Sequence, residues 1–196
     1  MRIVQNRTRS QRGFTLLEVM VTISITAVVG SMATANMVRA RRSVQGDGAM
    51  RIVMSELNLA REMAITQRHL MEVQFVGANW VRIVRHETPG NATTVVSSVA
   101  LESGANFALT GGVPDTPDAF GAAAAVSFGA AQTVMFGTDG TLIDTNGSPV
   151  NGTVFLSIAN LPESTRAVTV LGSTGRVRGY KWAAAGNGAN GSWVRV

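Results

Sequence analysis

The stretch RGFTLLEVM, Arg12 to Met20, places one acidic residue inside an apolar run. Glu18 is the only charged side chain in the 25 residues from 14 to 38. As an α-helix these residues would extend roughly 37 Å at ~1.5 Å per residue, which exceeds the ~30 Å hydrocarbon core of a bilayer. We therefore expect residues 14–38 to form a transmembrane helix, and the presence of Glu18 in it requires an explanation.

Basic residues border this apolar run on both sides. Residues 1–13 contain four arginines and no acid, and residues 39–42 contain three more arginines. The chain has a net charge of +5, from 17 basic and 12 acidic residues, and 17 minus the four leader arginines leaves 13 against 12. Most of the excess charge therefore belongs to the leader, where cations keep a segment on the cytoplasmic side of a membrane.

The composition excludes several classes of protein. With 196 residues, 45% of them hydrophobic and 15% charged, the chain is long enough for one domain with its own core and an appendage. It is neither a disordered chain nor a protein with many membrane spans. The absence of cysteine excludes disulfides, thiolate metal sites and cysteine nucleophiles.

A second, amphipathic stretch of helix is expected over residues 39–71. Apolar residues recur there at intervals of three and four, as on one face of a helix: Met50, Val53, Leu57, Ala60, Ala64 and Met71. The polar residues off this stripe are Arg51, Asn58, Arg61, Glu62 and Arg68. We expect the stripe to pack on the chain's own domain, and we expect Gly46 and Gly48 to bend the helix.

Residues 72–196 predict an antiparallel β domain. The segments MEVQFV (71–76) and WVRIVRH (80–86) alternate in hydrophobicity around GAN, which indicates a hairpin. Further strands are expected in TTVVSSVAL (93–101), AVSFGA (125–130), QTVMF (132–136), TVFLSIA (153–159) and RAVTVLG (166–172). Residues 103–125, rich in Gly, Ala and Pro, predict a long surface loop. The fold class is therefore α+β.

The position of Glu18 suggests a function in assembly. A charge in hydrocarbon costs ~2.5–3.5 kcal/mol on insertion scales and normally has a partner. Cleavage between Gly13 and Phe14 would supply one, because the new α-amino group of Phe14 is a cation on the helical face of Glu18. Between chains, the carboxylate of one subunit can pair with the amine of the next and favour one axial stagger. We therefore expect Glu18 to fix the register of assembly.

The segment RGFTLLEVMVTISITAVV resembles the class III leader of type IV pilins and type II secretion pseudopilins. It has a basic leader, Gly13 before the cut, Phe14 after it, Glu18, and then an apolar helix. The resemblance implies that a prepilin peptidase removes residues 1–13 and N-methylates Phe14. It also implies a pilin-like fold, in which a long N-terminal helix, transmembrane in its first half and amphipathic in its second, packs on a C-terminal antiparallel β domain.

The same resemblance implies a location and partners. The chain is expected in the bacterial inner membrane as a single pass, with a cytoplasmic N-terminus and a periplasmic C-terminal domain, and in a pilus or pseudopilus after assembly. Expected partners are the prepilin peptidase, other minor and major pilins or pseudopilins, the inner-membrane assembly platform and substrates of a secretin system. No cofactor and no enzymatic activity are implied. The expected function is protein secretion by a short periplasmic filament, with this chain near its tip.

An ordinary secretory signal is the alternative interpretation of the N-terminus. Ala33 and Ala35 form an A-x-A cleavage site after the apolar stretch. Two observations weigh against it: Glu18 lies near the start of the apolar region, and an amphipathic helix continues directly from that region. The mature N-terminus separates the interpretations, because pilin processing leaves Phe14 and signal cleavage leaves Asn36.

The C-terminal region is similar to one subgroup of these proteins. TVMFGTDGTL, TVFLSIA and RAVTVLGSTGRVR, within residues 133–178, are similar to the closing strands of GspH/FimT minor pilins. Some FimT-type pilins are implicated in DNA uptake through a G-R-x-R motif, which implies DNA-binding roles for Arg176 and Arg178, with Lys181 nearby. Cations and interleaved aromatic residues would bind DNA without sequence preference. We favour the alternative of a solvated closing strand, because the cleaved chain is nearly neutral.

The sequence contains no catalytic or metal-binding motif. It has no nucleophile elbow, P-loop or dinucleotide fingerprint. The two histidines, His69 and His86, lie on different predicted elements, so no metal pair is expected. Asp139, Asp144 and Asn146 lack the spacing of a calcium-binding loop and fit turn chemistry better.

Overall fold

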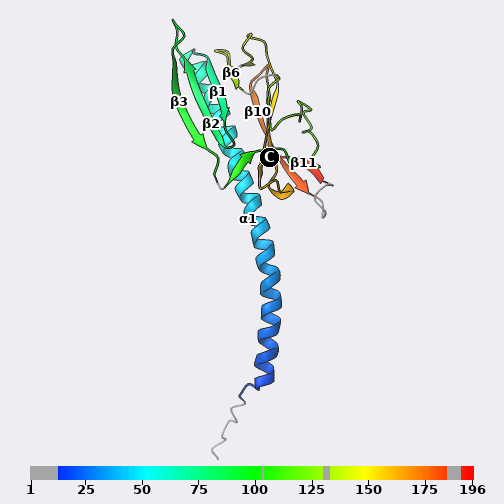
Figure 1. The fold of residues 1–196 in the computed structure, drawn as a ribbon. Helices are drawn as coiled ribbons and strands as arrows, with labels where there is room; N and C mark the ends of the chain where they lie inside the picture. Colours follow the sequence, from blue (N-terminus) through cyan, green and yellow to red (C-terminus); the bar gives the residue numbers. More distant parts are fainter. Residues whose placement is uncertain (1–12, 103, 130–132, 185–190) are drawn as a thin grey trace, which may run out of the picture. The chain divides into compact units, whose positions relative to one another are not determined.

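A computed structural model of the chain describes residues 13–102, 104–129, 133–184 and 191–196. The chain forms two compact units, Met1–Val38 and Arg39–Val196. One helix, α1 (Leu16–Gln67), contributes residues to both units. Two antiparallel sheets follow it along the chain (Figure 1). The predicted α+β class, a long N-terminal helix followed by an antiparallel β domain, is confirmed.

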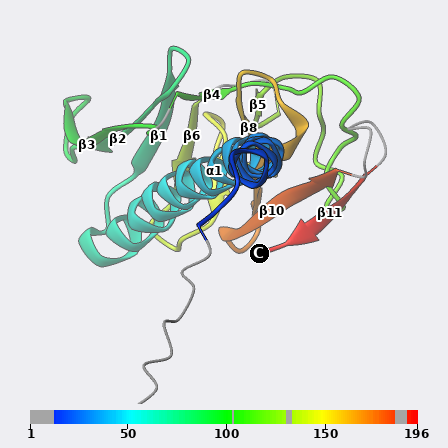
Figure 2. The same ribbon diagram turned by 90° about the horizontal axis from the view of Figure 1, so that it is seen from below.

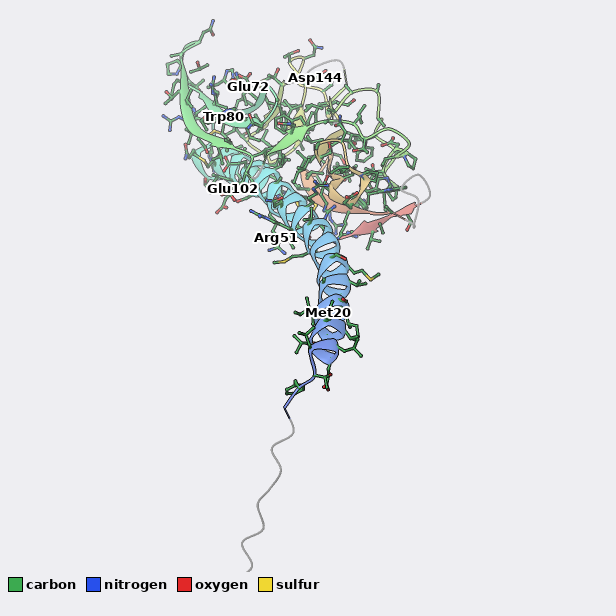
Figure 3. The ribbon with its side chains drawn as sticks, turned by 60° about the horizontal axis from the view of Figure 1, so that its bottom comes forward. Met20, Arg51, Glu72, Trp80, Glu102 and Asp144 are labelled. Carbon is green, nitrogen blue, oxygen red and sulfur yellow. The ribbon has the colours of Figure 1, made fainter. Side chains whose placement is uncertain are left out.

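In the first unit, α1 begins after the irregular residues 13–15. The hydroxyl of Thr15 accepts a hydrogen bond from the backbone N–H of Glu18 at 3.2 Å, as the side chain of an N-cap residue does. The large apolar side chains of this unit are exposed, and Figure 3 shows them projecting from the helix around Met20. Covering such a surface with lipid or with other helices is energetically favourable.

By length and mean hydropathy, no helix among the described residues qualifies as a membrane span, including the segment 14–38 in which we expected one. Hydroxyl groups interrupt the apolar run of this segment. Four of them donate hydrogen bonds of 2.7–2.9 Å to backbone carbonyls three or four residues earlier in α1: Thr22, Ser24, Thr26 and Ser31. These hydroxyls are therefore satisfied within the helix itself.

The second unit contains two antiparallel sheets. The first has the order β3-β2-β1-β6-β7 and consists of β1 (Met71–Val76), β2 (Trp80–His86), β3 (Thr93–Ala100), β6 (Thr133–Phe136) and β7 (Leu142–Ile143). β1 and β2 form the hairpin that the sequence predicts, with Val76 opposite Trp80. Buried and partly buried side chains alternate along β1, because one face of the strand lies against the core.

The second sheet has the order β11-β10-β9-β8-β4, and β5 also pairs with β8. Its strands are β4 (Ala105–Phe107), β5 (Val126–Ser127), β8 (Gly152–Ile158), β9 (Arg166–Leu171), β10 (Arg176–Ala184) and β11 (Gly191–Arg195), and the 3-10 helix η1 (Pro162–Ser164) precedes β9. Nearly every side chain of β8 and β9 is buried. Both faces of these central strands are therefore covered.

α1 covers one face of both sheets in the second unit. The predicted apolar stripe is fully buried at Met50, Val53, Leu57, Ala60 and Ala64. These residues share one core with Val73 and Ile83 of the first sheet and with Val154 and Val168 of the second. Figure 2 shows the cyan part of α1, which belongs to this unit, lying along β1 and β6.

α1 ends at Gln67, before the position that the sequence pattern indicated. Arg68 has a φ of 54°, a left-handed conformation that cannot continue a right-handed helix. Met71, which we expected at the end of the helical stripe, instead begins β1 and is buried there.

Two glycines lie within the continuous helix of α1. A side-chain carbon on Gly46 would lie 2.6 Å from the carbonyl oxygen of Ser164, so glycine allows α1 to approach this backbone closely. The same position on Gly48 has no heavy atom within 4 Å. The two glycines, which the sequence analysis treated alike, therefore differ in their surroundings.

Residues 108–125, called the docked segment below, have no helix or strand but are held against the second sheet. Asp118 accepts hydrogen bonds from Thr169 of β9 at 2.6 Å and from Tyr180 of β10 at 2.9 Å. Trp193 of β11 donates its indole N–H to the carbonyl of Pro114 at 3.0 Å. A small apolar cluster joins this segment to the sheet: Phe155, Ala167, Tyr180, Ala122 and Trp193. Most of the predicted surface loop is therefore a layer packed on the sheet.

Candidate functional site

The predicted processing and assembly residues lie at the start of α1. Gly13 and Phe14 immediately precede the helix, and the Phe14 side chain is 82% exposed. Glu18 is exposed in the first helical turn, where the helix dipole stabilises an acid by ~0.3–1 kcal/mol. Thr15 and Glu18 also have the T-x-x-E spacing of a capping box, a signal that our sequence analysis missed. Residues 1–12 lie outside the described residues.

Arg178 of the GRVR motif is neutralised by an acid of the docked segment. Its guanidinium group lies 2.5 Å from the carboxylate of Asp118, and the two side chains are only 25% and 11% exposed. Asp118 precedes it by 60 residues and also accepts hydrogen bonds from Thr169 and Tyr180. The expectation of a solvated arginine is therefore wrong for Arg178, because the folded docked segment supplies its counterion.

The side chains of the cluster around Asp118 keep one protonation state at neutral pH. Burial alone would raise the pKa of Asp118, but hydrogen bonds from Thr169 and Tyr180 and the charge of Arg178 lower this pKa below its ordinary value of 3.8. Burial, together with the hydrogen bond to Asp118, raises the pKa of Tyr180 above its ordinary value of 10.0. The carboxylate thus stays ionised and the phenol stays protonated, so the cluster joins elements and does not exchange protons.

Lys181 lies on the face of β10 opposite to Arg178, because side chains alternate along a strand. Its ammonium group lies 3.8 Å from Asp47 of α1. Asp47 also pairs at 2.6 Å with Arg166, whose side chain is completely buried. The structure therefore does not bring Lys181 together with Arg176 and Arg178 as one cationic surface.

Arg176 is exposed at the start of β10 and lines an open pocket of about 440 Å³. Residues of α1 and of the strand ends complete the lining: Asn58, Arg61, Leu171, Thr174, Gly175 and Val177. Arg61 donates a hydrogen bond from Nε to the carbonyl of Gly140 at 3.1 Å. Among the described residues, no acidic side chain lines this pocket.

Two glycines make room for the guanidinium group of Arg61. A side-chain carbon would lie 3.2 Å from Arg61 Nε if built on Gly140, and 2.8 Å from it if built on Gly175. Gly175 also has a φ of 61°, which favours glycine. Our sequence analysis placed Arg61 on the polar side of the helix and missed this arrangement. The signal for it was the pair of glycine-containing turns, GTDG and GSTG, which meet at the same arginine.

The part of the chain that the structure describes has no group of three or more His, Asp or Glu side chains able to hold a metal ion. The two histidines are closer than their sequence positions suggested: His69 Nδ1 lies 2.9 Å from the carbonyl of His86, and His86 Nε2 lies 2.8 Å from Glu72. Asp139 and Asp144 accept hydrogen bonds from backbone N–H groups of their own turns, as predicted from turn chemistry.

Comparisons with known proteins identify two matching regions. A family described as "Prokaryotic N-terminal methylation motif" matches residues 8–34, which include Gly13, Phe14 and Glu18. A family described as "Type II transport protein GspH" matches residues 49–175, more than half of the chain. No curated protein and no solved structure gives a significant match. The second region ends just before Arg176, so the arginines of GRVR lie beyond it.

Proposed function

Because the chain belongs to the family of GspH type II transport proteins, we propose that it is cleaved before Phe14 and assembled into a short filament for protein secretion. It is a minor pseudopilin or pilin of a type II secretion or type IV pilus system, and its family consists of structural subunits. Proteins of this family interact with other pilins and with the secretion machinery. The observation that carries the proposal is a methylation motif at the start of an exposed apolar helix.

Processing creates the charge that assembly requires. Prepilin peptidase hydrolyses the peptide bond between Gly13 and Phe14 and transfers a methyl group from a separate methyl donor to the new amino group, which remains a cation at neutral pH. The arginine-rich residues before the cut are removed on the cytoplasmic side. The inner-membrane platform then adds the subunit to the filament, near its tip.

Before assembly, the first part of α1 anchors the chain at the inner membrane. Its apolar side chains are exposed, and four of its hydroxyls are satisfied by backbone carbonyls within the helix. A polar group already hydrogen-bonded in this way can lie in apolar surroundings at a reduced cost. The same surface then packs against the helices of neighbouring subunits. The same apolar side chains therefore contact lipid before assembly and other helices after it.

Glu18 sets the axial register between subunits. Among the described residues its carboxylate has no hydrogen-bond or ion-pair partner, whereas its backbone N–H is bound by Thr15. In the filament, we assign the methylated amine of Phe14 on the adjoining subunit as the ion-pair partner of this carboxylate. Apolar contacts tolerate many staggers of two helices, whereas an ion pair in a water-poor environment favours only one.

Substitution of Glu18 tests this assignment. Glu18→Gln keeps the size of the side chain and removes its charge. Cleavage should remain normal, while incorporation into the filament should fall at least tenfold. A tenfold change corresponds to ~1.4 kcal/mol, close to the contribution of one charge-assisted hydrogen bond. Processing is followed by the mass of the mature chain, and incorporation by its amount in sheared filaments. Ser24→Ala, six residues further along α1, is the control and should behave like the unmodified chain. Incorporation of Glu18→Gln at the normal level would refute the register role.

DNA uptake is the second candidate function, and the structure gives it no specific support. Of the three predicted DNA-binding cations, Arg178 is paired with Asp118 and Lys181 lies beside Asp47 on the opposite face of β10. Of these three, only Arg176 is exposed without an ion-pair partner among the described residues. Neutralising several phosphates requires a continuous row of cations.

A further inference from the structure

The pocket between α1 and the start of β10 holds two cations that the fold does not neutralise. Five other cations of the second unit are paired with acids: Arg42 with Glu163, Arg85 with Glu87, Arg166 and Lys181 with Asp47, and Arg178 with Asp118. Arg61 and Arg176 have no acidic partner among the described residues, and both line the pocket of about 440 Å³. The pocket is therefore a local concentration of positive charge.

Arg61 is held in place by the backbone of Gly140. Its Nε donates to the carbonyl of Gly140, and the missing side chains of Gly140 and Gly175 leave the space that its guanidinium group occupies. The terminal amino groups of Arg61 make no hydrogen bond to any other described residue. A guanidinium fixed through Nε presents two parallel N–H donors, the geometry that matches the two oxygens of a carboxylate.

The rest of the lining suits a single small anion. The amide of Asn58 and the hydroxyl of Thr174 add neutral hydrogen-bonding groups beside the two arginines. Leu171 and Val177 form an apolar wall, which lowers the local dielectric and strengthens charge-assisted hydrogen bonds. Glu62 is the nearest acid in sequence, but it does not line this pocket; it lines a second pocket, which shares Asn58 and Arg61 with the first.

We propose that the pocket formed by Arg61 and Arg176 binds a carboxylate, an Asp or Glu side chain or a C-terminus, presented by a neighbouring pilin subunit. The identity of the partner rests on the proposed function, whereas the carboxylate chemistry rests on the pocket alone. The site adds a contact between globular domains to the contact between N-terminal helices.

A protein carboxylate fits the pocket better than a nucleic acid does. DNA presents a phosphate every few ångströms and binds to rows of cations. The cations that follow Arg176 in sequence are not available for such a row, since Arg178 is paired with Asp118 and Lys181 is directed to Asp47. The open pocket lined by Arg61 and Arg176 instead suits a single oxyanion.

Titration of the full chain in detergent tests the chemistry of the site. Sodium acetate serves as the carboxylate probe, inorganic phosphate as the competing oxyanion, and a single-stranded oligonucleotide as the nucleic acid. Binding is followed by the NMR signals of Arg61 Nε–H and of the Gly175 amide. We expect saturable shifts with acetate, and about tenfold weaker binding in Arg61→Gln and in Arg176→Gln, as loss of one charge-assisted hydrogen bond predicts.

Arg82→Gln removes one positive charge from β2, in the other sheet, and is the matched control for net charge. It should bind acetate as the unmodified chain does. Two results would overturn the proposal: no saturable shift with acetate, or an oligonucleotide that binds through Arg61 and Arg176 more tightly than acetate. Equal weakening by Arg82→Gln would also overturn it, because only the net charge of the chain would then matter.

Co-purification from cells tests the partner separately. The double variant Arg61→Gln with Arg176→Gln should be cleaved before Phe14 as usual, yet recover at least tenfold less of its sibling pilins than the Arg82→Gln control. Undiminished recovery would exclude a pilin carboxylate as the ligand. A chain that is not cleaved before Phe14 would refute the proposed function, while the acetate titration would still report on the pocket.

Discussion

Asp118 connects three parts of the second unit through one carboxylate. It belongs to the docked segment, pairs with Arg178, and accepts hydrogen bonds from Thr169 and Tyr180. Asp118→Asn should lower the free energy of unfolding by about 1–3 kcal/mol, because it leaves a partly buried cation without its counterion. Chemical denaturation measures this loss. Glu102→Gln, at an exposed acid, is the control and should change stability by less than ~0.5 kcal/mol.

The same variant should change how stability depends on pH. The folded-state pKa of Asp118 is lowered, so its contribution is complete above the ordinary value of 3.8 and is lost as the pH falls through the lower folded value. The stability difference between Asp118→Asn and the unmodified chain should therefore be largest at neutral pH and shrink below about pH 3.8. A difference that stays constant with pH would contradict the ion-pair account.

At this scale the sequence predicts individual residues only where a local pattern carries the information. Gly13, Phe14 and Glu18 could be singled out because they stand at fixed offsets before an uncharged run. The pairing of Asp118 with Arg178 could not be, since the two residues are 60 positions apart and no periodicity links them. For the same reason the hydrogen bond of Arg61 to Gly140 could not be predicted, because the two residues are 79 positions apart.

At the scale of elements, Gly46 and Gly48 give a matched test of how α1 packs. Gly46→Ala would place a carbon 2.6 Å from the Ser164 carbonyl, and overpacking of this kind typically costs ~1–3 kcal/mol. Gly48→Ala meets no atom within 4 Å and should stabilise the chain by ~0.5–1 kcal/mol through helix propensity.

Chemical denaturation of the two alanine variants separates packing from propensity. The predicted order of stability is Gly48→Ala, then the unmodified chain, then Gly46→Ala. If both substitutions stabilised the chain, α1 would not approach the Ser164 backbone as closely as described. If both substitutions destabilised the chain, the description of Gly48 as having open surroundings would be incorrect.

Elements with a clear period were predicted well, and elements defined by long-range contacts were not. The hairpin of β1 and β2 agrees with the sequence pattern, and burial alternates along β1 because one buried face imposes a period of two. In β2 the alternation is interrupted where Ile83 and Val84 are both buried. The buried apolar stripe of α1 was also predicted correctly as far as Ala64. The end of the helix depends on the backbone conformation of Arg68, and the docked segment depends on Asp118 and Trp193, neither of which a periodicity reveals.

At the scale of the whole molecule, the two units have different tasks. The first presents an exposed apolar helix with a single acid in its first turn, which suits lateral packing with other helices. The second folds around its own core and carries the pocket of Arg61 and Arg176 on its surface. We propose that the first unit sets the filament register and that the second makes contact between globular domains.

The central claim is that the chain becomes an assembly subunit when cleavage exposes the amine of Phe14. Mass spectrometry of the mature protein, isolated from the membranes that produce it, tests this claim most directly. The account predicts an N-terminal peptide that begins at Phe14 and carries one added methyl group. A mature chain that begins at Asn36, or that retains Met1, would contradict it.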